Sequence, residues 1–211
     1  MTHNASRRSF LAAAASIGLS VPFLVANARA QQRGEHSRML VACFSRTGNT
    51  RTVAEQVQLL TGADLFALKT THSYPAEYRA TTDQAKREQQ EGFRPQLTEQ
   101  VDNMADYDVV FVGYPNWWGT MPMAFFSFLE AYDFAGKTIV PFCTHEGSRL
   151  GRSVRDIEAI CPQSTILEGL SLRGASDGSI RTASASAQEA VRDWVAGVGI
   201  QGKPRAGAMS Q

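Results

Sequence analysis

The chain has 211 residues, of which 43% are hydrophobic and 19% are charged, and its formal net charge is +1. These values are typical of a globular protein whose core is large enough to fold without disulfides or a structural metal. The near-neutral charge disfavours a nucleic-acid binder that relies on bulk positive charge. The three cysteines and four histidines form neither C-x-x-C nor H-E-x-x-H, so we expect no metal site.

The first thirty residues have the pattern of an export signal. Arg7 and Arg8 precede a 15-residue apolar stretch, 11–25, and an A-x-A sequence ends at Ala30. The paired arginines resemble the twin-arginine signal, which directs bacterial proteins out of the cytoplasm. The stretch is shorter than the roughly 20 residues that span a bilayer, so no stable membrane span is expected. We therefore expect a periplasmic protein, cleaved near Ala30, whose mature chain has 18 basic and 20 acidic residues and a net charge of −2.

Strand and helix patterns alternate along the rest of the chain. Apolar runs predict five strands, at 39–44, 63–68, 107–113, 138–143 and 165–172. Apolar residues at helical spacing, or helix-forming composition, predict five helices, at 50–60, 78–92, 121–132, 153–160 and 184–196. This alternation indicates an α/β domain with a parallel sheet between two layers of helices, over residues 38–197. We expect a linker at 31–37 and a flexible tail at 198–211.

Ligands of such sheets bind beyond the carboxyl ends of the strands. The loops that follow the first, third and fourth predicted strands are therefore the candidates for a binding site. The first loop, 44–50, reads F-S-R-T-G-N-T and joins a buried strand to a helix. Its backbone donors at a helix N-terminus favour an anion such as a phosphate. The loop lacks G-K-[ST], which disfavours nucleotide hydrolysis. It also lacks G-x-G-x-x-G, which weakens the case for a dinucleotide-binding site.

The other two loops offer aromatic and polar groups. The second loop, 113–122, contains adjacent tryptophans, Trp117 and Trp118, which cannot both enter a core behind the loop. A flat aromatic ligand stacked on one of them would explain this placement. The third loop, 144–151, places His145 beside Glu146 in a segment framed by glycines.

These three loops resemble the FMN-binding loops of the flavodoxin family. The likeness rests on S-R-T-G-N-T at 45–50, Y-P-N-W-W-G at 114–119 and T-H-E-G-S at 144–148, and it extends over about residues 39–195. A bacterial flavodoxin-like branch whose second loop carries a tryptophan pair is the most similar. The resemblance implies a five-stranded sheet of order 2-1-3-4-5 with the flavin near the first and third strands.

The resemblance also implies a set of cofactor-binding residues. The first loop would hold the FMN phosphate, the second would lie along the isoalloxazine ring, and the third would line its other edge. The implied residues are Ser45, Arg46, Thr47, Gly48, Asn49, Thr50, Pro115, Asn116, Trp117, Trp118, Gly119, Thr144, His145, Glu146 and Gly147. Many flavodoxins stack a tyrosine of the third loop on the flavin, whereas the third loop here has no aromatic residue other than His145.

The function implied is electron transfer through FMN by an exported protein, with no residue assigned as a catalytic acid or base. The partner would be a redox protein or a small quinone-like acceptor, and no nucleic acid is expected. One alternative is an FMN-dependent NAD(P)H or quinone oxidoreductase, in which His145 or Tyr114 orients the substrate. Another is a non-catalytic module that binds a phosphorylated aromatic ligand. A hydrolase is disfavoured because Ser45 lacks a G-x-S-x-G sequence.

The three cysteines are expected to be buried free thiols. In a sheet of order 2-1-3-4-5, Cys43 and Cys143 would be separated by the third strand, at about 10 Å. A disulfide needs Cα atoms within roughly 7 Å, so no bridge between them is predicted.

Overall fold

A computed structural model describes residues 37–174 and 184–200. The predicted signal peptide, the linker up to residue 36 and the predicted tail from residue 201 lie outside the described residues. Val198 and Ile200, at the start of the predicted tail, pack against the hydrophobic core. No helix within the described ranges is long and apolar enough to cross a membrane.

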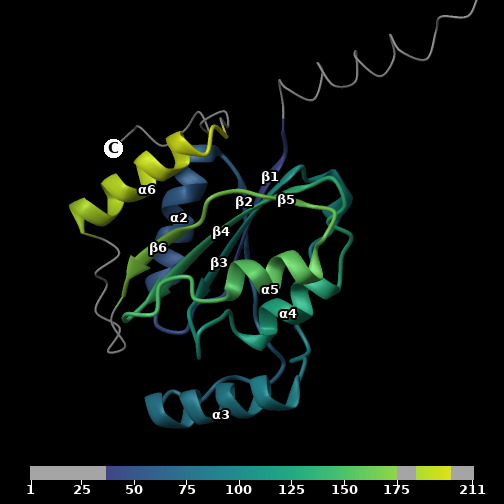
Figure 1. The fold of residues 1–211 in the computed structure, drawn as a ribbon, viewed down its shortest axis with the longest axis vertical. Coiled ribbons are helices and arrows are strands. Elements are labelled where there is room, and N and C mark those ends of the chain that lie inside the picture. The colour runs from purple at the N-terminus through teal and green to yellow at the C-terminus, as the bar shows by residue number, and fades with distance from the viewer. Residues whose placement is uncertain (1–36, 175–183, 201–211) are drawn as a thin grey trace, which may run out of the picture. The chain divides into compact units, whose positions relative to one another are not determined.

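A parallel sheet forms the centre of the domain (Figure 1). Its strands are β1 (Met39–Cys43), β2 (Asp64–Ala67), β3 (Val109–Pro115), β4 (Thr138–His145) and β5 (Thr165–Ile166), in the order β2-β1-β3-β4-β5. This order confirms the α/β fold and the 2-1-3-4-5 arrangement predicted from the sequence. Because β1 and β3 are neighbours, the loops that follow them leave the sheet side by side.

The predicted fifth strand is divided into two short strands. β5 and β6 (Leu170–Arg173) both pair with β4, and residues 167–169 separate them. The carbonyl oxygens of Lys137, just before β4, and of Ile139 within it accept hydrogen bonds from the backbone N–H groups of Thr165 and Leu167. The next residue of β4 on this side is Pro141, which has no N–H to donate, so the pairing is interrupted there. The expectation of one continuous strand was wrong for this reason.

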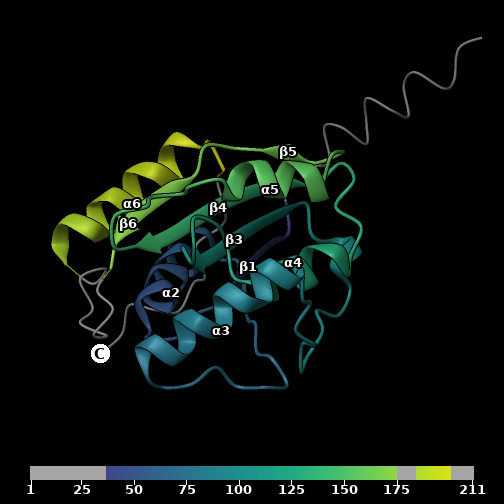
Figure 2. The ribbon, with the colours of Figure 1, turned by 60° about the horizontal axis from the view of Figure 1, so that its bottom comes forward.

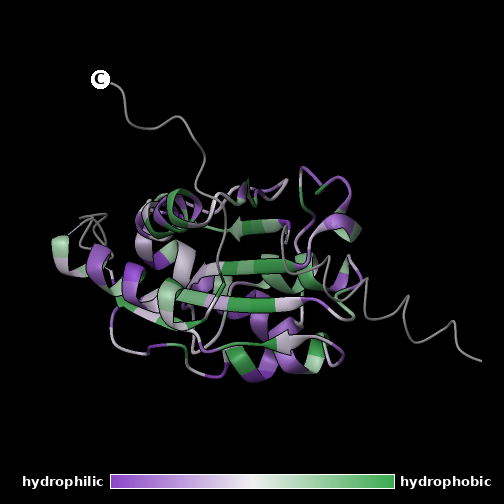
Figure 3. Ribbon diagram, turned by 90° about the horizontal axis from the view of Figure 1, so that it is seen from above, coloured by the Kyte–Doolittle hydropathy of each residue, from purple (hydrophilic) through white to green (hydrophobic). Residues whose placement is uncertain are grey.

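Alternate strand residues supply two hydrophobic clusters, one on each face of the sheet. One face is covered by α2 (Asn49–Thr61) and α6 (Ala185–Gly197), and the other by α4 (Met123–Glu130) and α5 (Ser153–Ile160). Figure 3 shows hydrophobic strands between helices whose outer surfaces are hydrophilic. Helix α4 begins two residues later than predicted because Pro122 occupies its N-cap position and restrains the residue before it.

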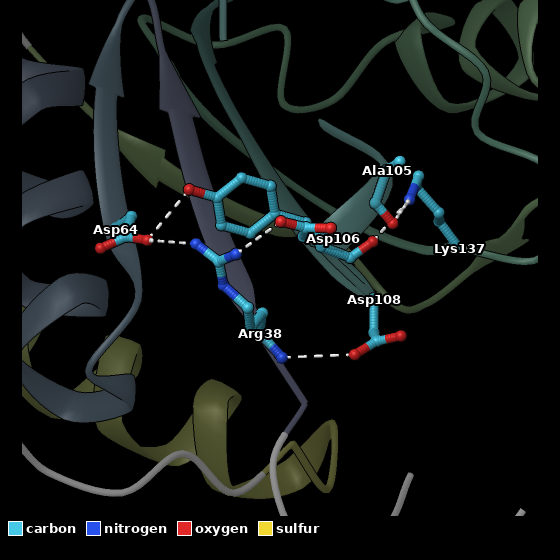
Figure 4. Close-up of polar contacts among 7 residues, drawn as sticks. Arg38, Asp64, Ala105, Asp106, Asp108 and Lys137 are labelled. Atoms are coloured by element: carbon cyan, nitrogen blue, oxygen red, sulfur yellow. Dashed lines mark hydrogen bonds and ion pairs between the residues drawn. The ribbon is translucent and has the colours of Figure 1, made fainter. Parts of the chain in front are cut away.

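Polar contacts fasten the amino-terminal edge of the sheet (Figure 4). The Arg38 guanidinium lies 2.9 Å from a carboxylate oxygen of Asp106 and 3.7 Å from one of Asp64. Lys137, which is buried, donates to the carbonyl oxygens of Tyr107 and Ala105. These contacts join the starts of four strands, so the opposite, carboxyl-terminal edge remains for the loops of the candidate site.

Helix α3 (Tyr78–Glu91) does not belong to either of the two helix layers that cover the sheet (Figures 1 and 2). Its N-cap residue is Glu77, whose carboxylate accepts hydrogen bonds from the N–H groups of Arg79 and Ala80, and its C-cap residue is Gly92, in the left-handed conformation. Only Thr81, Ala85 and Glu88 are buried along its length. The prediction of a mostly solvent-facing helix is therefore confirmed.

The three cysteines are free and buried, as predicted. Burial raises the pKa of the Cys43 and Cys143 thiols to about 12 and that of Cys161 to about 11. At neutral pH all three are protonated, which makes them unreactive in the folded protein.

Candidate functional site

The first loop ends at the N-terminus of α2. Gly48 is the N-cap residue, with φ +93°, and no described side chain caps the helix. The Gly48 N–H donates to Ser45 Oγ at 3.2 Å, and Asn49 Nδ2 donates to Thr47 Oγ1 at 3.3 Å. The positive end of the α2 dipole faces the site.

The second loop contains a tight turn at residues 117–120. Trp117 and Thr120 exchange backbone hydrogen bonds of 2.8 and 3.2 Å. The two central residues, Trp118 and Gly119, have φ values of +53° and +84°, as a type I′ turn requires. A tryptophan is an unfavourable residue for this conformation, so the turn holds Trp118 at some cost in backbone strain.

The two tryptophans have different surroundings. Trp117 makes edge-on contacts with Phe44 and Tyr74, at centroid distances of 5.5 and 5.0 Å. Trp118 is 47% exposed, and its indole N–H donates to the carbonyl oxygen of Thr82 in α3 at 2.8 Å. Trp117 therefore packs against the core, while Trp118 has a ring available to a ligand.

The third loop is fastened to the other two. Thr144 Oγ1 lies 2.8 Å from Thr50 Oγ1, and the Thr144 carbonyl oxygen accepts the N–H of Asn116 at 2.8 Å. The carbonyl oxygen of Arg149 accepts Asn116 Nδ2 at 2.6 Å. At Gly151 the loops are so close that a Cβ atom would lie 2.2 Å from the carbonyl oxygen of Gly119. Side-chain and backbone contacts thus hold the three loops as one unit.

The three loops surround a cavity of about 540 Å³, a volume typical of a small-molecule site. Twelve of the fifteen residues implied by the resemblance line it: Ser45, Arg46, Thr47, Asn49, Thr50, Pro115, Asn116, Trp117, Trp118, Thr144, His145 and Glu146. The other three, Gly48, Gly119 and Gly147, lie in the loops but do not line the cavity. Their backbones shape the turns.

Sequence reasoning missed one wall of the cavity. Tyr78, Arg79, Thr81, Thr82 and Asp83 of α3 line it, together with Gly174 after β6. Tyr78 and Thr82 are four residues apart and so lie on one face of the helix. An exposed tyrosine at the start of a polar helix was the available signal, but no sequence pattern indicates where such a helix packs.

The cavity is lined by both basic and acidic side chains. Arg46 and Arg79 line it, and the Lys86 ammonium group lies 4.8 Å from the centre of the Trp118 ring. Asp83 and Glu146 are the acidic residues of the lining. An anionic ligand would meet the first-loop donors, the α2 N-terminus and Arg46 at one end of the cavity.

His145 has a buried ring nitrogen, Nδ1, without a hydrogen-bond partner among the described residues. Burial, and secondarily the charges of Arg149 and Arg173, lower the pKa of His145 below its ordinary value. The imidazole is therefore neutral at neutral pH, and Nδ1 can accept from or donate to a ligand according to its tautomer. A bound molecule with polar ring atoms would satisfy it.

We expect His145 to make the folded protein less stable in mild acid. Its pKa is lower in the folded than in the unfolded chain, so the unfolded chain binds the proton first as the pH falls through about 6.5. The midpoint of thermal unfolding, followed by circular dichroism from pH 7.5 to 5.5, should therefore fall more steeply in wild type than in His145→Gln. His72→Gln, at an exposed histidine outside the cavity, is the control. Equal slopes in wild type and His145→Gln would contradict this expectation.

The residues present fit a phosphorylated flavin. The α2 N-terminus and the first loop suit its phosphate, Trp118 suits its ring system, and His145 Nδ1 suits a polar ring edge. The carboxyl edge of a doubly wound sheet, where these groups meet, is also the usual ligand position of such folds.

The fold and the site thus define an α/β protein built to bind a phosphorylated aromatic molecule, and the comparisons with known proteins agree. The sequence profile of the flavodoxin family matches residues 38–196. The chain belongs to the flavodoxin family.

Solved structures show the same fold. A candidate flavoprotein from Bacteroides eggerthii DSM 20697 is 30% identical, with a TM-score of 0.65 over 79% of this chain and 100% of that one. A second, from Bacteroides uniformis ATCC 8492, is 29% identical, with a TM-score of 0.63 over 77% of this chain and 99% of that one. A flavoprotein from Lactobacillus acidophilus NCFM, solved in complex with FMN, is 21% identical, with a TM-score of 0.54 over 65% of this chain and 93% of that one. No curated protein matched the chain. FMN is the cofactor that the family and the cavity support.

Proposed function

We propose that this protein binds FMN in the cavity and transfers electrons through it to a redox protein or a small quinone-like acceptor. The observation that carries the proposal is a cavity that joins the N-terminus of α2 to the half-exposed Trp118. Membership of the flavodoxin family supports the same function. We further propose that the protein acts outside the cytoplasm, because residues 1–30 have the pattern of a twin-arginine signal.

Bound FMN supplies the one- or two-electron chemistry, and the protein supplies binding and electrostatics. Ser45, Thr47 and the first turn of α2 bind the phosphate through hydroxyl and backbone donors. Trp118 and His145 orient the ring system. No side chain is assigned as a general acid or base.

The proposal is tested by removing any bound flavin from the purified protein and titrating it with FMN and with riboflavin, which lacks the phosphate. Visible absorption should show FMN bound at one equivalent. Riboflavin should bind more weakly because it has no phosphate for the first loop to bind. Equal affinity for the two ligands would contradict a phosphate site at the first loop. A protein that binds neither would refute the proposed function.

Replacing Trp118 by asparagine should raise the Kd for FMN about tenfold. Asparagine readily takes positive φ beside Gly119, so the type I′ turn is kept while the ring is lost. An aromatic contact contributes about 0.5–1.5 kcal/mol beyond its buried area, and tenfold corresponds to about 1.4 kcal/mol. Trp118→Phe, which keeps a ring, should retain most of the affinity in the same titration. An unchanged Kd in Trp118→Asn would show that this ring does not contact the flavin.

A further inference from the structure

Helix α3 is bonded to the loops of the cavity. The Trp118 indole N–H donates to Thr82 within the helix, and Lys86 lies over the ring of the same tryptophan. Just before the helix, the Ala76 carbonyl oxygen accepts a hydrogen bond from the Arg46 guanidinium at 3.2 Å. Two of the three flavodoxin loops are therefore attached to this helix, which closes one side of the cavity.

A buried carboxylate sets the rotation of α3 about its axis. Glu88, only 7% exposed, accepts hydrogen bonds from the Tyr74 hydroxyl at 2.6 Å and from Gln84 Nε2 at 2.8 Å. With Thr81 and Ala85 it forms the buried face of the helix. Residues 78, 82 and 86 recur every four positions and occupy a neighbouring face, which is turned toward Trp118 and the cavity.

Tyr78 is the aromatic residue of that face. It lines the cavity and is 51% exposed, so the residue is accessible to a ligand in the cavity. The Arg46 guanidinium lies 6.0 Å from the centre of the ring. A tyrosine that lines a ligand cavity can bury its ring against a flat ligand while its hydroxyl stays in water.

We propose that Tyr78 is a cofactor-binding residue that packs against the ring system of the flavin. This proposal rests on the proposed function. It assigns to α3 an aromatic contact with the flavin that the third loop, whose only aromatic residue is His145, does not supply. Through this contact, the site selects ligands that carry both a phosphate for the first loop and a ring that reaches α3.

The test compares Tyr78→Ala and Tyr78→Leu with Phe93→Ala in titrations of the flavin-free protein with FMN and riboflavin. Phe93 is the matched control because it is also 51% exposed, lies just beyond the other end of α3 and does not line the cavity. Both Tyr78 variants should raise the Kd for FMN about three- to tenfold, as expected for a lost aromatic contact. They should raise the Kd for riboflavin by the same factor, because a ring contact does not involve the phosphate. Phe93→Ala should bind both ligands as wild type does.

Other outcomes separate this proposal from the proposed function. If wild type binds FMN and both Tyr78 variants bind it equally well, the assignment of Tyr78 is overturned and the function stands. If the variants lose affinity for FMN but not for riboflavin, Tyr78 acts through Arg46 on the phosphate end, and the ring contact is overturned. If wild type binds neither ligand, both proposals fail. Circular dichroism spectra identical to wild type would show that the variants are folded.

Discussion

Thr47→Glu should abolish the binding of FMN at micromolar concentrations while leaving the protein folded. Thr47 lines the end of the cavity formed by the first loop and the α2 N-terminus, and it is half-buried. A carboxylate there would face the phosphate of the ligand. At about 5 Å and an effective dielectric constant of about 20, each pair of like charges costs roughly 3 kcal/mol. The Kd should therefore rise more than 100-fold.

Riboflavin separates this electrostatic effect from damage to the cavity. Because riboflavin has no phosphate, its Kd should change only slightly in Thr47→Glu. Gln100→Glu, which adds the same charge at an exposed position outside the cavity, should bind FMN as wild type does. Isothermal titration of both ligands with both variants measures the effect. A parallel loss of FMN and riboflavin in Thr47→Glu would contradict a phosphate position at the first loop.

Gly151→Ala should lower the free energy of unfolding by about 3 kcal/mol. The residue has φ +58°, a conformation that costs an L-residue roughly 1–2 kcal/mol. Its new Cβ atom would also lie 2.2 Å from the backbone oxygen of Gly119, which accepts the N–H of Arg152 at 2.8 Å. Backbone atoms cannot yield as a flexible side chain would, so the second and third loops must separate.

Gly147→Ala is the matched control for this change. Gly147 lies in the same loop, but an added Cβ would meet no atom within 4 Å, and its φ lies outside the left-handed region. Its effect should stay within about 0.5 kcal/mol. Urea unfolding followed by tryptophan fluorescence gives both values. Equal midpoints for the two variants would show that the close approach of the loops does not contribute to stability.

The sheet could be predicted from the sequence because buried parallel strands consist of consecutive apolar residues. The runs at β1, β3 and β4 have this form, and the strand order followed from the resemblance of the loops to flavodoxins. Pro141, which causes the division of the fifth strand, is visible in the sequence. Its effect could not be predicted, however, because a proline interrupts pairing only with the strand that its nitrogen faces. The direction in which a residue points across a sheet is fixed only when the register is known.

The loops of the site could be predicted in the same way, since their residues follow strands whose carboxyl ends meet. The α3 wall could not, because its attachment depends on a few contacts between distant residues. The bond from Trp118 to Thr82 and the buried Glu88 carboxylate leave no periodic pattern in the sequence. The turn at Trp118 was equally hidden, because type I′ turns are recognised by asparagine and glycine, and a tryptophan occupies the first position here.

The hydroxyl pair formed by Thr50 and Thr144 joins residues 94 positions apart, and Gly174 after β6 completes the cavity beside Asn49. A growing polypeptide therefore has no binding site until nearly all of the domain has been synthesised and β6 has docked. The cofactor cannot guide the early steps of folding, and it stabilises only the finished domain, by about 2.7 kcal/mol at a concentration 100 times its Kd. A shortage of FMN would thus lower the amount of this protein by exposing completed molecules to proteases, without slowing their folding.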